Sequence, residues 1–467
     1  MPSTSTSPSS RRSPNWLRHP LVWIAVVCAA LMGGLITSSY IGGLVDPVGH
    51  LQDAPIGFVN ADPGVTVGAT QLDAGSQIQD QVTGTGDGRI DWQVLDSQAE
   101  AERRIRDDDL WGAVVVPNGF SAAVAGMASA PTTAKAAELV ILTNEGAGLF
   151  QPSFFSEVSD EAVAATSSSV RQQLVGLLDQ GGTTLPADAA AVIGNPVVAD
   201  ETAVVALPAK AGRGIAPFYL TVMITLSGFL AASIVGVGLD LLRGSDRLEL
   251  LGRPVELRPG GHERGSLGAG APQAGDDIRP LRLWVAKAFP TLVAAVLAGL
   301  AAVFAALVLF GMDVSSAPKA YAVGALGSAA VAMISLWFLT LFGIAGELVG
   351  VLFTTIFGVP AALGIYPYQA VPGVFRFIAA WHPMRFLSDA MRSIAFYGGS
   401  GAGLGRGVAV VAAWLVGAIV VGGATAWLLD RRAPAASTPE PSATVEGRGA
   451  VAVDTSDDVP APAPRTT

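Results

Sequence analysis

The sequence has very few of the residues that form metal centres and covalent cross-links. It contains 1 cysteine and 4 histidines among 467 residues. One cysteine cannot form an intramolecular disulfide, and Cys28 lies inside an apolar run, where it acts most simply as a small packing side chain. The histidines are scattered and never lie at positions i and i+4, so no zinc-binding motif is present. We therefore expect neither a metal site nor a cofactor.

Motifs for catalysis are also absent. The chain has no G-x-x-x-x-G-K-[ST] motif, so it does not hold nucleotide phosphates as P-loop ATPases do. It has no G-x-S-x-G motif, which is the usual context of a serine nucleophile in hydrolases. These absences predict that the chain is not an enzyme and has no ATPase activity of its own.

Charged residues are scarce, at 14%, whereas soluble proteins contain about 25%. Hydrophobic residues make up 51% of the chain, and they are concentrated in runs close to the length of about 20 residues that crosses a bilayer. The runs are Leu21–Ile41, Pro217–Leu241, Ala288–Phe310, Ala320–Ile344, Leu348–Tyr366 and Gly407–Leu429. We predict six transmembrane helices. The fourth and fifth runs form either a tight hairpin of two spans or one span followed by a re-entrant segment.

The arginines around these runs predict the orientation, because cytoplasmic loops carry an excess of basic residues. Arginines precede the first run and follow the last, and others lie in the loop after the second run. Both termini are therefore expected in the cytoplasm of a multi-pass plasma-membrane protein, with residues 43–215 outside. One loop fits this orientation less well, because it lies outside and yet contains Arg376, Arg385, Arg392 and Arg406. A cleaved signal peptide is an alternative for the first run, and it also leaves 43–215 outside.

The predicted organisation alternates membrane segments with polar ones. Residues 1–19 and 431–467 are disordered cytoplasmic tails, 20–42 and 216–242 are the first two transmembrane helices, and 43–215 form an extracytoplasmic α/β domain. Residues 243–283 form a cytoplasmic loop, and 284–430 hold helices 3 to 6 with an interfacial helical segment near 374–399. The fold class is thus a polytopic α-helical membrane protein with an inserted α/β domain.

Residues 43–215 hold most of the acidic excess behind the net charge of −10, which excludes nucleic acid as a partner. Strand and helix patterns alternate along this segment. Strands are predicted at 56–59, 90–96, 111–117 and 137–145, and helices near 66–82, at 97–110 with Ser97 as N-cap, from 118 and over 150–180. Asn118 or Ser121 is expected to cap the third of these helices. The alternation predicts a small, mainly parallel sheet covered by helices.

Three stretches in this segment have a family resemblance. They are "APIGFVNADPG", "WQVLDSQAEAERRIRDDDLWGAVVVPNGFSAAVAG" and "AELVILTNEG". They resemble the extracellular domain of the phage-infection-protein (Pip/YhgE) branch of the ABC-2-type permease superfamily, including an A-x-x-x-P-x-x-F-S segment. The resemblance covers the first helix, the α/β domain and the five-helix C-terminal block. It implies a membrane permease subunit that forms a homo- or heterodimer and works with a separate ABC ATPase.

The "VNADPG" turn has a local structural explanation. Asn60 and Asp62 bond turn amides, Pro63 fixes φ, and Gly64 accepts a positive φ. We interpret these four residues as the structural turn that ends the first strand. A ligand site at this turn is the alternative interpretation.

The stretch 383–399 predicts an amphipathic helix. Pro383 suits the first helical turn, and Gly398 and Gly399 end the helix. The apolar face contains Met384, Leu387, Met391 and Ile394, and the polar face contains Arg385, Asp389 and Arg392. Such a helix can lie in the membrane interface. ABC-2-type exporters have a short helical pair at this place in the chain, so the resemblance implies an outer gate; a passive connector is the alternative.

Two functions remain open from the sequence. The first is a permease that moves an amphiphilic or envelope-related substrate outward, with the 243–283 loop touching the ATPase. The second is a non-transporting scaffold or receptor whose outer domain binds an envelope, phage or secretion partner. Ion-coupled transport is disfavoured, because the ionisable residues near the spans fall at helix ends. These residues are Asp240, Lys287, Asp313 and Glu347.

Overall fold

The computed structural model describes most of the chain between residues 46 and 432. The described residues are 46–242 without 68–69, 85–87, 131–132, 134 and 182–186; the pairs 249–250 and 253–254; 280–432 without 344; and single positions between 23 and 38. Most of the first apolar run, most of the 243–283 loop and nearly all of the predicted tails lie outside the described residues.

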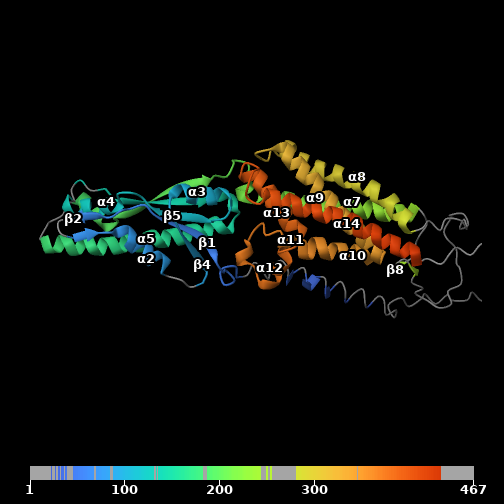
Figure 1. Cartoon of the computed structure of the whole chain (residues 1–467), viewed down its shortest axis with the longest axis horizontal. Coiled ribbons are helices and arrows are strands. Elements are labelled where there is room, and N and C mark those ends of the chain that lie inside the picture. The colour runs from blue at the N-terminus through green and yellow to red at the C-terminus, as the bar shows by residue number, and fades with distance from the viewer. Residues whose placement is uncertain are drawn as a thin grey trace, which may run out of the picture.

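The molecule is elongated, with an α/β domain and a helix bundle lying end to end (Figure 1). The α/β domain precedes the bundle in the chain, and α13, α12 and α11 lie at the end of the bundle that faces it. The bundle elements are α7 (Ala216–Leu242), α8 (Pro280–Phe304), α9 (Ala317–Phe342), α10 (Ala345–Val351), α11 (Val359–Ala361), α12 (Gly373–Ala379), α13 (Pro383–Phe396) and α14 (Leu404–Arg432).

The α/β domain contains a five-stranded sheet with the order β4-β1-β5-β6-β7. Its strands are β1 (Ala54–Asn60), β4 (Ile90–Leu95), β5 (Gly112–Val116), β6 (Ala137–Asn144) and β7 (Val197–Val205). Only the β5–β6 pair is antiparallel, so the predicted mainly parallel sheet is confirmed. The first four strands lie where the sequence pattern predicts them, and β7 was not predicted.

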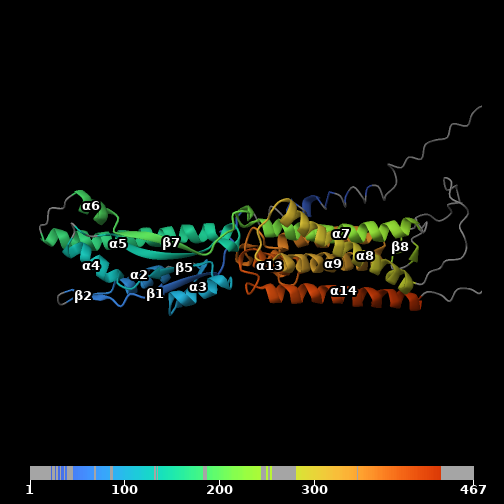
Figure 2. The same ribbon diagram turned by 90° about the horizontal axis from the view of Figure 1, so that it is seen from above.

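Helices cover both faces of this sheet. One face packs against α2 (Ala74–Thr83), α4 (Phe120–Ser129) and the 32-residue α5 (Phe150–Gly181), which Figure 2 shows running along the domain. The other face packs against α3 (Gln98–Arg106), which begins at the predicted N-cap Ser97. The helix predicted near 66–82 is shorter than expected, because a small hairpin of β2 (Val65–Val67) and β3 (Thr70–Leu72) precedes α2.

The predicted turn at the end of β1 joins that strand to α4. Gly64 has a φ of +73°, as predicted, and the Asn60 side chain accepts from the Asp62 amide. The Asp62 carboxylate accepts from both the amide and the hydroxyl of Ser121 in the first turn of α4. Asp62 therefore caps α4 from 59 residues away, and the prediction of a local cap was wrong. Gly119 is the N-cap residue and makes no side-chain bond.

Four helices in the described residues are long and apolar enough to cross a membrane. They are Ala216–Leu239, Pro280–Leu309, Ala317–Phe342 and Leu404–Arg431. The fifth predicted span differs, because its apolar helix covers Ala345–Ala361 and contains a π-helical stretch, Leu352–Gly358. It ends there because Leu363 adopts a φ of +51°, which is outside the helical region. Its 17 residues fall short of about 20, and the first predicted span lies largely outside the described residues.

The central helix of the bundle is α9, and small residues allow close packing around it. A Cβ at Gly228 of α7 would lie 2.3 Å from the Ser328 carbonyl of α9, and one at Gly299 of α8 would lie 2.5 Å from that of Gly324. Close backbone approach through glycine is typical of packing between membrane helices. Outward-facing side chains of α8, including Phe289 and Leu297, remain 72% and 60% exposed, as the surface of a membrane protein requires.

Candidate functional site at the junction

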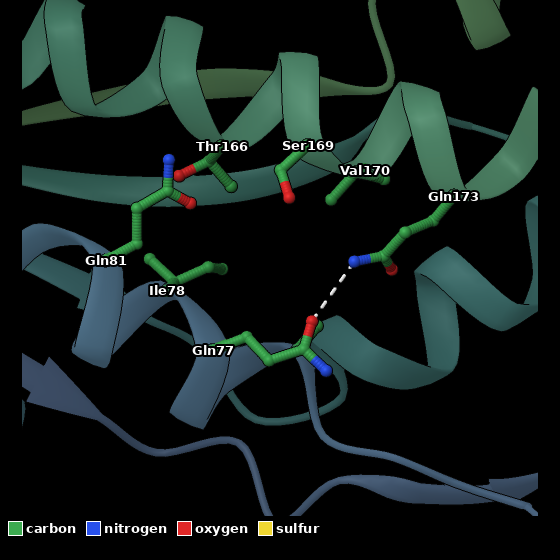
Figure 3. A pocket seen from close by; sticks show the side chains of 8 residues that line it. Gln77, Ile78, Gln81, Thr166, Ser169, Val170 and Gln173 are labelled. Atoms are coloured by element: carbon green, nitrogen blue, oxygen red, sulfur yellow. Dashed lines mark hydrogen bonds between the residues drawn. The ribbon is translucent and has the colours of Figure 1, made fainter.

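One groove of the α/β domain is too small to hold a substrate. The groove between α2 and α5 is lined mainly by uncharged polar side chains, among them Gln77, Gln81 and Gln173 (Figure 3). Gln173 Nε2 donates to Gln77 Oε1 across it at 3.1 Å. Its volume of about 10 Å³ is that of one water molecule. Among the described residues, no group of three or more His, Cys, Asp or Glu side chains is placed to hold a metal ion.

The junction between the two parts of the molecule is built around α13. His382 is its N-cap, and the ring Nδ1 accepts from the Met384 amide at 3.2 Å. Pro383 occupies the first turn, and Gly398 and Gly399 follow the helix with φ values of +71° and +65°. The predicted amphipathic helix is therefore present between the predicted signals.

The apolar face of α13 is buried within the protein, whereas its predicted place at the membrane interface stays a prediction. Met384, Leu387, Met391 and Ile394 are all at most 3% exposed. They pack against α7, α9 and α14, and a Cβ at Gly327 of α9 would lie 2.6 Å from both Leu387 methyl carbons. The helix is amphipathic because its other face meets a polar surface of the protein, and its apolar face fills the bundle interior.

The polar face of α13 directs Arg392 toward the α/β domain. The Arg392 guanidinium forms an ion pair with the Asp108 carboxylate, which follows α3, and also donates to the Ala147 carbonyl at 3.4 Å. Arg385 and Asp389 remain on α13 and face each other at 3.8 Å, the distance that also separates Asp389 from Arg392. Of the predicted gate residues, Arg392 is thus the one whose partners lie in the other domain.

Four side chains form a polar network across the junction, which we call the junction network: Asp108, Asn144, Arg392 and Tyr397. The Tyr397 hydroxyl donates to Asp108 Oδ1 at 2.7 Å and lies 3.0 Å from Asn144 Oδ1. Asn144 is fully buried at the end of β6, and its amide donates to the Leu110 carbonyl at 3.3 Å. Asp108 has a φ of +63°, a conformation that Asp tolerates better than most residues.

Burial strengthens this network. Burial alone would lower the pKa of Arg392, but the neighbouring groups, with Asp108 first among them and Asp389 also contributing, together outweigh burial and raise the pKa above its ordinary value. Burial, together with Asp108, raises the pKa of Tyr397 well above its ordinary value. Arg392 therefore stays charged and Tyr397 stays protonated, so both remain donors to Asp108 at physiological pH.

The junction also shares an apolar core with the sheet. Ala395, Phe396 and Tyr397 at the end of α13 are buried together with residues of β1, β5 and α3, among them Val59, Ile105 and Val115. The C-terminal end of α13 is joined to the bundle as well, because the Ser315 amide before α9 donates to the Ile394 carbonyl at 2.9 Å. One helix end is thus fixed to the sheet and to the bundle at once.

A second contact joins the domains on the opposite face of the sheet. Phe150 of α5 lies 5.5 Å from the Tyr366 ring, measured between centroids. The Gln52 side chain accepts from Arg376 of α12 at 3.0 Å. Contacts on both faces restrict rotation of the α/β domain about α13.

We predict that Gly146→Val destabilises the junction. A Cβ at Gly146 would lie 2.8 Å from Val205 Cγ1 and 3.0 Å from Phe396 Cβ, so a larger side chain must push α13 away from β7. Overpacking of this kind costs about 1–3 kcal/mol, and thermal unfolding of the detergent-solubilised chain should show a lower Tm. Gly126→Ala in α4, where a Cβ meets nothing within 4 Å, is the control and should not lower the Tm. An unchanged Tm for Gly146→Val would contradict tight packing here.

A family model described as ABC-2 family transporter protein matches residues 21–428, a range that contains the α/β domain, the bundle and the junction. Neither the curated proteins nor the solved structures yield a match.

Proposed function

We propose, because the chain belongs to the ABC-2 transporter family, that it is the permease subunit of an exporter driven by a separate ATPase. Members of this family supply the membrane-spanning part of an ABC transporter, and this chain lacks the P-loop motif that an ATPase needs. The proposed substrate is amphiphilic or envelope-related and moves outward. On the motifs quoted above, we place the chain in the Pip/YhgE-like branch.

The observation that carries the proposal is the position of α13. Its apolar face is buried against three of the four candidate spans, and its C-terminal end is fixed to the α/β domain. A helix held in this way closes the end of the bundle beside the α/β domain. We propose that α13 is the outer gate and that the junction network couples its position to that domain.

The proposed orientation places the α/β domain outside the plasma membrane and both termini in the cytoplasm. The arginines before the first apolar run and at the end of α14 support it, because basic residues flank spans on the cytoplasmic side. The exposed apolar faces of α7, α8 and α14 suit contact with lipid and with a second permease copy or a related subunit.

Co-purification tests the proposed function. The tagged full chain is isolated from its own membranes in mild detergent, and the proteins bound to it are identified by mass spectrometry. We expect a P-loop ATPase in stoichiometric amount, with ATP hydrolysis that depends on the chain. In the matched variant, residues 255–279 are replaced by a Gly-Ser linker of equal length, and we expect loss of the ATPase, because the 243–283 loop is the proposed contact. Absence of any ATPase, with an envelope protein bound in its place, would instead favour the scaffold function.

A further inference from the structure

Three arginines near the junction are arranged around two aromatic rings, in what we call the arginine ladder: Arg376, Arg385 and Arg406 with Tyr368 and Phe386. The guanidinium carbons of Arg376 and Arg385 lie 5.9 and 4.7 Å from the centre of the Tyr368 ring. Those of Arg385 and Arg406 lie 5.6 and 5.3 Å from the centre of the Phe386 ring. Each ring therefore holds two guanidinium groups in place by cation–π attraction.

The positive charge of this ladder is poorly neutralised. Among the described residues, the only carboxylate in ion-pair distance of the three arginines is Asp389, which lies 3.8 Å from Arg385 and faces Arg392 at the same distance. The Arg376 Nε is buried and has no acceptor in the described part of the chain. Arg406 is exposed. The terminal nitrogens of Arg376 donate to Gln52 and to the Val371 carbonyl, so Arg376 contributes mainly charge, and the free donors of the ladder lie on Arg385 and Arg406.

The ladder lies near the edge of the apolar part of the bundle, on the side of the α/β domain. Arg406 is in the first turn of α14, which is a candidate span. α13 lies beside the start of α14, since a Cβ at Gly407 would be 2.5 Å from the Phe386 carbonyl. On α12, Val374 and Phe377 flank Arg376 in sequence and are 68% and 71% exposed. Exposed apolar side chains at this position suit contact with lipid.

This arrangement also accounts for the loop that does not fit the predicted orientation. In that orientation, Arg376, Arg385 and Arg406 lie outside, where the positive-inside rule disfavours them. Buried or membrane-level charges are rare without a function. Arg392 is explained by its partner Asp108, whereas the three ladder arginines have no comparable partner among the described residues.

We propose that the arginine ladder binds the anionic, phosphate-bearing headgroup of an amphiphile in the leaflet beside the α/β domain, with Val374 and Phe377 against its acyl chains. Guanidinium groups bind phosphate oxygens in pairs of parallel hydrogen bonds, which makes arginine the preferred residue for this chemistry. A membrane lipid is the committed occupant, because the apolar side chains that border the ladder have no use for a small soluble anion. An anionic membrane lipid is then the substrate class of the exporter, and this assignment rests on the proposed function.

Lipid binding to the full chain tests the site. The purified chain in neutral detergent is titrated with phosphatidylglycerol or with phosphatidylcholine, and bound lipid is counted by native mass spectrometry. We expect preferential binding of phosphatidylglycerol and a loss of about tenfold in its affinity for Arg385→Gln/Arg406→Gln. Arg431→Gln is the matched control, because Arg431 also lies on a tryptophan ring of α14, at the opposite end of the helix. It should bind phosphatidylglycerol with nearly unchanged affinity.

Additional measurements distinguish a lipid site from a site for a soluble anion. Inorganic phosphate at millimolar concentration should not displace the lipid. Displacement by phosphate would show a site for soluble anions and overturn the lipid assignment. The variant Val374→Ser/Phe377→Ser should bind the lipid more weakly. Equal affinity of the double arginine variant and the unaltered chain, or an equal loss in Arg431→Gln, would overturn the ladder site. If the double variant does not fold, the exposed Arg406→Gln serves alone. The measurement needs no ATPase, so it fails or succeeds independently of the co-purification result.

Discussion

Replacing Arg392 with glutamine is expected to lower the free energy of unfolding by about 3–5 kcal/mol. The side chain of Asp108 is 15% exposed, and the substitution leaves its charge buried without its cationic partner. Removing one member of a buried ion pair is far more damaging than removing an exposed pair, because the remaining charge has lost its hydration and gained nothing in return. The expected result is a drop in Tm for the detergent-solubilised chain that exceeds the drop for Gly146→Val.

A double-mutant cycle distinguishes the ion pair from a general loss of packing. Asp108→Asn keeps the shape of the side chain and an acceptor for the Tyr397 hydroxyl, so Arg392→Gln/Asp108→Asn should be more stable than Arg392→Gln alone. Arg103→Gln in α3 is the control, because its side chain is 62% exposed and its ion pairs at 3.7 and 3.8 Å are surface pairs worth at most about 1 kcal/mol. Additive effects of the two substitutions would contradict a direct Arg392–Asp108 interaction.

The sheet was predictable where local pattern and burial agree. β5 is buried along its whole length. A buried strand is what its continuous apolar sequence, followed directly by a proline, predicts. β7 was not predictable in the same way, because only its two ends are buried and five consecutive residues between them are exposed. An edge strand of this kind has neither an apolar run nor an alternating pattern, and its pairing with β6 decides its conformation.

The candidate site was predictable as a helix but not as a junction. The spacing of Met384, Leu387 and Met391 shows an apolar face, and the same spacing fits a lipid surface or a protein interior. Asp108 lies 284 residues from Arg392, and Asn144 lies 253 residues from Tyr397. Contacts over such separations depend on how the domain docks, which no local pattern encodes. The available signal is the run of three aspartates at 107–109, which the pattern places inside the predicted helix 97–110, whereas α3 ends at Arg106.

The length of the fifth apolar segment shows a further limit of composition. Residues 348–366 are apolar enough for a span, yet the helix stops at Ala361, where the chain turns through Leu363. The chain then reaches Tyr366, which contacts Phe150 of the α/β domain. The residues between Ala361 and Tyr366, which composition alone assigns to the membrane, therefore form part of the contact with that domain.

The strongest test of the gate is to place charges on the buried face of α13. Leu387→Asp and Met391→Asp together are expected to abolish export and ATPase stimulation in the reconstituted complex. Both side chains are at most 3% exposed and belong to the core between α13 and the spans, so each carboxylate would be buried without a partner. An isolated buried charge costs at least several kcal/mol, and α13 can reduce this cost only by moving out of the bundle.

A control variant at the same two positions distinguishes the effect of charge from the effect of replacing the side chains. Leu387→Met/Met391→Leu conserves volume and hydrophobicity, and such exchanges in a core usually cost less than about 1.5 kcal/mol, so export should persist. Val94→Asp places a charge on an exposed position of β4, away from α13 and the arginine ladder, and should not affect export, since that side chain is 54% exposed. Insertion of each variant is checked by size-exclusion chromatography and by the Tm of the α/β domain. Because the spans themselves are unaltered, an inserted Leu387→Asp/Met391→Asp chain that exports normally would show that α13 connects the domains without gating the path.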